Sequence, residues 1–208
     1  MPRSTTELLA LHGLRLMGFA AATDVAQRFG LAERDVTAEL ERAAEAGFAR
    51  RRTGERPGWA LTAEGRKENE RLLAVELDRA GHRTAVRTIY RDFLALNPRL
   101  LSACTSWQIL DLDAQVLNDH QDPDYDASVI ADLHEIHLDA LPICADLESL
   151  LDRFGSYRPR LVTAMANIGN GRTEWFTKPT IDSYHTVWFE LHEDLLATLG
   201  LDRAAEQN

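Results

Sequence analysis

The sequence predicts a mainly α-helical protein in two parts, on three observations. Apolar residues recur at helical spacing through most of the 208-residue chain. Strand-like patterning is confined to residues 48–61, around a turn rich in Gly and Pro. Residues 1–81 carry 13 basic and 13 acidic side chains, whereas residues 82–208 carry 10 and 20, so the net charge of −10 lies entirely in the second part. We therefore expect domains at residues 1–81 and 82–208 with different partners.

The composition is that of a folded globular protein, with 45% apolar and 27% charged residues. No apolar run approaches the roughly 20 residues that cross a bilayer. The N-terminus has no signal-peptide core, so we expect a cytoplasmic protein that does not bind membranes. Cys104 and Cys144 show neither metal-site nor disulfide-scaffold spacing. Two free thiols suit a reducing compartment.

Three helices are expected at the start of the first domain. The first begins after Ser4, because Ser4 and Glu7 have the spacing of a capping box. Thr23 can cap a short second helix over residues 24–29. That helix ends at Gly30, which can adopt the left-handed conformation. The third helix spans residues 32–46. Two short helices joined by a tight turn that contains Gly are typical of a helix-turn-helix.

A two-stranded hairpin and a long helix are expected next. Residues 48–52 and 59–61 form the strands, and the turn between them contains Gly and Pro. Thr62 can then cap a helix that runs to about Ala80.

This order of elements resembles the MarR-like winged-helix regulators and, more loosely, the PadR-like ones. The resemblance covers about 80 of 208 residues and is carried by Thr23–Leu31, Leu40 with Gly47-Phe48, Arg50–Arg52 and Trp59–Gly65. The last segment is similar to the Leu-Thr-x-x-Gly that follows the second wing strand in those families. The resemblance implies a winged helix-turn-helix that binds double-stranded DNA, with residues 32–46 as its recognition helix.

Basic residues gather on the hairpin, where Glu55 is the one acidic side chain. Because side chains alternate along a strand, Arg50 and Arg52 should face one way and Arg51 the other, so some of them must face solvent. Guanidinium groups there can bind phosphate or enter a minor groove, although a merely solvated basic hairpin is the alternative. On the recognition helix, Arg34 and Thr37 could contact base edges. The five acidic residues of that helix predict modest, salt-sensitive affinity. The expected DNA-binding residues are Arg34, Thr37, Ala38, Arg42, Arg50, Arg51, Arg52 and Arg56.

Residues 82–208 are expected to form an all-helical domain of about five helices. The expected spans are 82–96, 100–112, 126–153, 157–168 and 180–199. Asn97-Pro98 should separate the first two, because proline fits the first turn of a new helix. Asp126 should cap the third helix.

Aromatic and polar side chains in this domain predict a small-molecule pocket, for which a plain aromatic core is the alternative. The candidate ligand-binding residues are Trp107, His120, Tyr184, His185, Trp188 and His192. A more speculative site is a zinc or nickel ion held by His134, His137, His185 and His192. Two antiparallel helices could gather these four, although histidines beside a core stripe more often form hydrogen bonds.

No nucleophile elbow, HExxH, P-loop or GxGxxG motif occurs, so we do not expect an enzyme. The leading interpretation is a DNA-binding transcriptional regulator that forms a homodimer through residues 63–97 and the second domain. That domain would sense a small-molecule effector, dimerise, or both. One alternative is a regulator whose acidic domain docks a protein partner. A metal-binding helical bundle with an accessory winged helix is the other.

Overall fold

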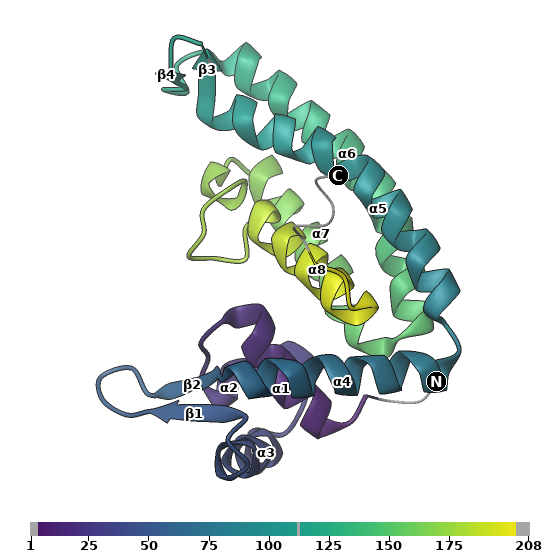
Figure 1. Cartoon of the computed structure of the whole chain (residues 1–208). Helices are drawn as coiled ribbons and strands as arrows, with labels where there is room; N and C mark the ends of the chain where they lie inside the picture. Colours follow the sequence, from purple (N-terminus) through teal and green to yellow (C-terminus); the bar gives the residue numbers. More distant parts are fainter. Residues whose placement is uncertain (1–3, 112, 203–208) are drawn as a thin grey trace. The chain divides into compact units, whose positions relative to one another are not determined.

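The structure, a computed structural model, describes residues 4–111 and 113–202. These residues are mainly helical, with eight α-helices, two short 3₁₀ helices and two small antiparallel hairpins (Figure 1). They form two compact units. Unit 1 holds the chain up to Val86, Leu150–Ser156 and the chain from His192 on, and unit 2 holds Arg87–Ser149 and Tyr157–Leu191. The predicted domain boundary between residues 81 and 82 stays a prediction.

Unit 1 opens with three helices, a hairpin and a fourth helix. Their bounds are α1 Thr6–Met17, α2 Ala22–Phe29, α3 Glu33–Glu45, β1 Ala49–Arg52, β2 Gly58–Leu61 and α4 Ala63–Ala80. The predicted elements are therefore present, but two caps differ from the prediction. The hydroxyl of Thr5, and not that of Ser4, caps α1 by accepting a hydrogen bond from the N–H of Leu8. Thr23 lies inside α2, whose first turn is closed by Asp24 accepting from the N–H of Ala21.

The core of unit 1 lies between α1, α2, α3 and the hairpin. Leu14, Val25, Val36 and Leu40 are buried there, and Trp59 of β2 closes the cluster. The chain between α1 and α2 also joins the hairpin, because Ala20 and Trp59 exchange backbone hydrogen bonds of 3.1 and 2.8 Å. A second, smaller cluster joins α1 to α4 and to the helical segment after His192 through Leu8, Leu73 and Ala197.

The later helices differ from the prediction in three places. Their bounds are α5 Arg83–Gln108, α6 Pro123–Leu150, η1 Asp152–Ser156, α7 Tyr157–Gly169, η2 Thr173–Trp175 and α8 Tyr184–Leu199. Helix α5 continues through Pro98, so the predicted break there is wrong. Pro98 is exposed, so water can replace the backbone hydrogen bond that proline cannot donate within the helix. The cap of α6 is Asp122, not Asp126, because Asp122 accepts from the N–H of Asp124 and Tyr125. Helix α8 begins four residues later than expected.

The expectation that residues 82–208 are all helical is wrong at one point. Strands β3 (Ile109–Asp111) and β4 (Val116–Leu117) pair as a short antiparallel hairpin between α5 and α6. The carboxylate of Asp111 accepts from the N–H groups of Asp113 and Ala114, and Gln115 has a φ of 53°, so the chain turns back sharply. No helix among the described residues is both long and apolar enough to span a bilayer.

Candidate nucleic-acid interface

The β1–β2 hairpin carries arginines on both of its faces. Arg50 pairs with Ala60, Arg51 with Trp59 and Arg52 with Gly58. Because directly paired residues share a face, Arg51 lies on the side of Trp59, and Arg50 and Arg52 lie on the other. All three arginine side chains, and Arg56 in the turn, are exposed. The alternation expected from the sequence is therefore present, and every arginine of the hairpin reaches solvent.

Arg51 is held by the indole ring of Trp59. The Arg51 Cζ lies 5.4 Å from the ring centroid, and Trp59 itself is only 6% exposed. A guanidinium at this distance from an indole ring gains a cation–π attraction. The buried Trp59 thus gives Arg51 a fixed support at the edge of the core.

On the opposite face of the hairpin, the Phe19 ring supports Arg52 by the same kind of cation–π contact. The Arg52 Cζ lies 5.9 Å from the Phe19 ring, which is 39% exposed. The bridge between Ala20 and Trp59 fixes Phe19 beside the hairpin. Gly58 makes room for the ring, because a Cβ on Gly58 would lie 2.6 Å from the Phe19 Cζ. The sequence analysis did not identify Phe19 as part of the site. The only feature in the sequence that pointed to it was its position directly after Gly18, in the link between two helices.

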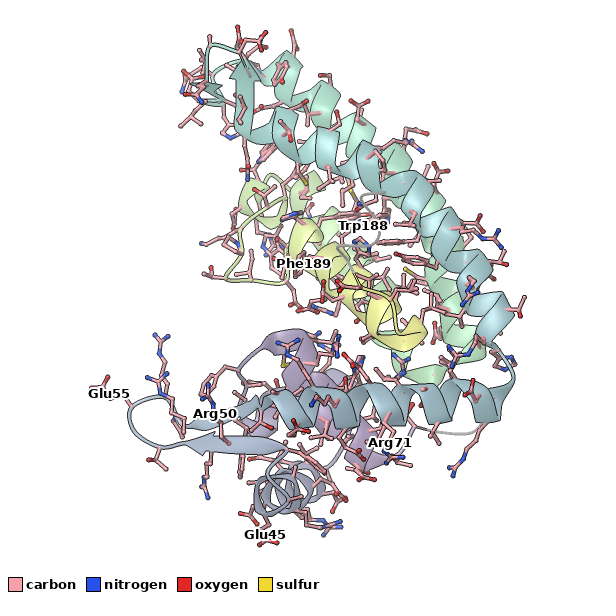
Figure 2. All side chains as sticks on the ribbon, in the orientation of Figure 1. Glu45, Arg50, Glu55, Arg71, Trp188 and Phe189 are labelled. Carbon is pink, nitrogen blue, oxygen red and sulfur yellow. The ribbon has the colours of Figure 1, made fainter. Side chains whose placement is uncertain are left out.

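The arginines of the hairpin differ from those of α3 in their counter-ions. Arg34 pairs with Asp35 at 3.2 Å and Arg42 pairs with Glu39 at 2.8 Å. In the described part of the chain, no carboxylate lies within 4.0 Å of the guanidinium groups of the hairpin arginines. The hairpin therefore carries uncompensated positive charge, and the positive charges of α3 are compensated locally. Figure 2 shows Arg50 on the hairpin, with Glu55 at its tip.

Helix α3 exposes two of the four residues that were predicted on it to bind DNA. Arg34 and Arg42 are exposed, Thr37 and Ala38 are half-buried, and Val36 and Leu40 face the core. The helix also holds five acidic residues, among them the exposed Glu45 at its end (Figure 2). Its surface is thus net negative, as the sequence predicts.

The predicted ligand-binding residues meet in pairs. Trp107 stacks on Phe176 at 4.7 Å between ring centroids and lies 4.5 Å from the His120 ring. The Trp188 ring stacks on the Phe93 ring with 4.6 Å between their centroids, and the Tyr184 ring centroid lies 6.4 Å from that of Trp188. All of these rings except the exposed His120 lie in the interior of unit 2.

The remaining two candidates, His185 and His192, are half-buried and buried. Burial lowers the pKa of His185. Two cavities of about 420 and 280 Å³ open on unit 1, and none of the six candidate residues lines either of them. The small-molecule pocket stays a prediction.

The four histidines do not form a metal site. His134 is exposed and its ring centroid lies 6.5 Å from that of buried His137. His137 Nδ1 lies 3.4 Å from the Tyr184 hydroxyl, and both burial and the neighbouring His134 lower the pKa of His137. Across residues 4–111 and 113–202, no three His, Cys, Asp or Glu side chains gather as metal ligands. The speculative metal site is therefore not supported, because His137 is used in the core of unit 2.

Comparison of the chain with known protein families, with curated proteins and with solved structures found no match. The resemblance to MarR-like and PadR-like regulators therefore stays a prediction. Function is inferred from the residues of the exposed hairpin and α3.

Proposed function

We propose that the chain is a DNA-binding transcriptional regulator whose first unit is a winged helix-turn-helix. The observation that carries this proposal is the β1–β2 hairpin, which exposes four arginines without a carboxylate partner among the described residues. The order α1, α2, α3, β1, β2, α4, with Ala20 joined to Trp59 of the hairpin by an isolated β-bridge, supports it. Phosphate groups of a duplex are the natural partners of such a surface.

The aromatic supports strengthen the proposal. Long arginine side chains lose rotamer entropy on binding, which costs roughly 0.5–1.5 kcal/mol for each side chain that becomes immobile. Trp59 and Phe19 restrict Arg51 and Arg52 before any ligand is bound. Part of that entropy is therefore lost on folding, and the two arginines meet DNA already oriented.

Helix α3 would supply sequence discrimination in this scheme. Arg34 and Thr37 lie in its first two turns, where a recognition helix approaches base edges. The acidic residues of α3 would repel phosphate, so affinity for a single half-site is low. A homodimer that places two copies of α3 about 34 Å apart would compensate.

A second candidate function for the later part of the chain is docking of a protein partner. The β3–β4 hairpin exposes Leu110 (43%), Val116 (46%) and Leu117 (72%). Exposed apolar side chains that cluster on one element are more typical of protein contacts than of a solvated surface. Dimerisation, a protein partner and a small-molecule effector all remain proposals for this part of the chain.

The test is DNA binding by the full chain at several salt concentrations. Removal of one arginine that neutralises a phosphate should make the slope of log affinity against log salt concentration less steep by about 0.9. Arg51→Ala with Arg52→Ala should therefore flatten the slope by up to about two units, and weaken specific and random duplexes alike. Fluorescence anisotropy of a labelled duplex measures both quantities.

The matched control is Arg71→Ala with Arg79→Ala on α4. These two arginines are exposed on α4, outside the hairpin, and their loss changes the net charge equally, although Arg71 pairs with Glu68 and the hairpin arginines have no such partner among the described residues. Figure 2 shows Arg71 on α4. The control should retain the parental slope. If the hairpin variant, shown to be folded by circular dichroism, binds like the parent at every salt concentration, the hairpin is not a DNA element and protein docking becomes the better proposal.

A further inference from the structure

The β3–β4 hairpin places apolar side chains in water at the joined ends of α5 and α6 (Figure 1). Leu110, Val116 and Leu117 are all exposed, and Leu117, at 72%, has the largest exposed fraction of any large apolar residue in the described chain. A connection that only reverses the direction of the chain is usually built from polar residues, Gly and Pro. Apolar side chains that cluster at such a position are instead typical of a surface that a partner covers.

Hydrogen bonds fasten this hairpin to the two helices. The N–H of Asn118 donates to the carbonyl of Gln108 at 2.9 Å, and the side-chain amide of Asn118 donates to Asp126 Oδ1 at 2.9 Å. His120 Nδ1 lies 3.0 Å from Asp126 Oδ2, and the imidazole lies 4.5 Å from the buried Trp107 ring, measured between centroids. The apolar side chains are therefore presented by an ordered element, which a partner does not have to order on binding.

The surroundings of the hairpin are strongly acidic. Residues 100–152 contain twelve Asp and Glu residues and no Lys or Arg. Five of these acidic residues lie in the hairpin or directly after it and are exposed, namely Asp111, Asp113, Asp119, Asp122 and Asp124. None of the five forms an ion pair with another described residue. Asp111 pairs with Val116 in the strand register, so uncompensated negative charge lies beside the exposed apolar side chains.

This charge argues against two occupants of the hairpin. A DNA duplex is repelled by an acidic surface. The same hairpin of a second copy, in a symmetric contact, would bring identical aspartates together, and like charges that face each other weaken an interface. A positively charged protein segment has neither disadvantage. Its apolar side chains can cover those of the hairpin, and its Lys or Arg residues can pair with the aspartates at the rim.

We propose that the β3–β4 hairpin docks a basic segment of another protein, whose apolar side chains cover Leu110, Val116 and Leu117. Strands β3 and β4 pair only with each other among the described residues, so each has a free edge to which an extended segment can add backbone hydrogen bonds. The basic partner rests on the docking function proposed above for this hairpin, and it is independent of DNA binding.

Labelled synthetic peptides of defined charge test the proposal on the full chain, with fluorescence anisotropy as the measurement. One peptide alternates Lys with Val, a second alternates Glu with Val, and a third alternates Lys with Ser. The Lys-Val peptide should bind, and its affinity should fall as the salt concentration rises. Each of the other two should bind at least about tenfold more weakly, because each lacks one of the two required chemistries. If the Glu-Val peptide binds the hairpin as tightly as the Lys-Val peptide, docking stands but the basic partner is overturned.

Variants matched in exposure locate the contact. Val116→Ser with Leu117→Ser removes two apolar side chains from the hairpin and should weaken binding of the Lys-Val peptide at least about tenfold. The control is Leu138→Ser with Val162→Ser, which removes two exposed apolar side chains (48% and 43%) from α6 and α7 and should bind like the parent. Equal binding by the parent and by the hairpin variant, or no binding by the parent, would overturn the basic partner and the docking function together.

Two further measurements separate the remaining outcomes. Asp113→Asn with Asp119→Asn, which keeps the shape of both side chains, should weaken the Lys-Val peptide and reduce its salt dependence. Asp132→Asn with Glu148→Gln, at exposed positions of α6, should do neither, and equal effects of the two pairs would overturn the proposal. Light scattering of the variant Val116→Ser with Leu117→Ser should give the parental mass. A lower mass would show that a second copy covers the hairpin, and would overturn the basic partner. The same variant should bind DNA like the parent, so failure of this proposal is distinguishable from failure of the DNA-binding proposal.

Discussion

Replacement of Gly65 by alanine should destabilise unit 1 because α4 closely approaches the backbone of Phe48, the residue before β1, at this point. A Cβ on Gly65 would lie 1.8 Å from the carbonyl oxygen of Phe48 and 2.7 Å from its carbonyl carbon. That carbonyl cannot move freely, since it accepts the N–H of Thr62 at 3.0 Å. The Thr62 hydroxyl also donates to the carbonyl of Gly47 at 2.7 Å and accepts the N–H of Gly65 at 3.0 Å. Alanine must therefore push apart two backbone segments that hydrogen bonds hold together.

The magnitude follows from two opposing effects. Overpacking of a close contact costs about 1–3 kcal/mol, and the upper end applies because the neighbour is backbone. Alanine recovers about 1 kcal/mol of helix propensity. A net loss of about 2 kcal/mol lowers the unfolding midpoint of a chain of this size by roughly 4–8 °C, which circular dichroism measures.

The matched control for Gly65 is Gly169→Ala at the end of α7. No heavy atom of the described residues lies within 4 Å of a Cβ built there, so this substitution should leave the midpoint unchanged or raise it slightly. If Gly65→Ala unfolds at the parental temperature, the close approach of α4 to Phe48 is not a feature of the folded protein.

Three further predictions concern the hairpin, the thiols and assembly. Gly58→Ala should displace the Phe19 ring from Arg52 and weaken DNA binding about two- to fivefold without changing the salt slope; an unchanged affinity would refute the role of the ring. Burial raises the pKa of both Cys104 and Cys144 to about 12, so a thiol reagent at pH 8 should label the chain only after denaturation. Rapid labelling of the native protein would contradict this. Light scattering at micromolar concentration should give twice the chain mass of 23.4 kDa, and a monomer would remove the proposed dimer.

Much of the fold of unit 1 could be predicted because its signals are local. Gly30 and Gly47 have positive φ angles of 64° and 80° at the ends of α2 and α3, as their positions suggest. Thr62 caps α4 as expected. Strand alternation, which needs no tertiary information, predicted that some of the hairpin arginines face solvent; the structure exposes them on both faces.

The errors arise where distant residues or solvent decide the outcome. Helix α5 continues through Pro98 because Pro98 is exposed to water. The Asn97-Pro98 dipeptide alone does not reveal whether the proline will be exposed or buried. The support of Arg52 by Phe19 depends on the bridge between Ala20 and Trp59, which are 39 positions apart in the chain. Arg153 resembles a surface residue in the sequence, yet its partners Glu76 and Asp194 lie 77 and 41 positions away. Such contacts leave no periodic signal.

The most direct test of the central claim is sequencing of the fragments that the full-length protein retains from genomic DNA. A DNA-binding regulator should enrich a small set of fragments, with two half-sites about one helical turn apart, roughly 10–10.5 base pairs, or a multiple of that distance. The variant with Arg51→Ala and Arg52→Ala should lose that enrichment, and the control variant with Arg71→Ala and Arg79→Ala should keep it. Retention of no fragment, or the same enrichment by the folded hairpin variant, would contradict the account.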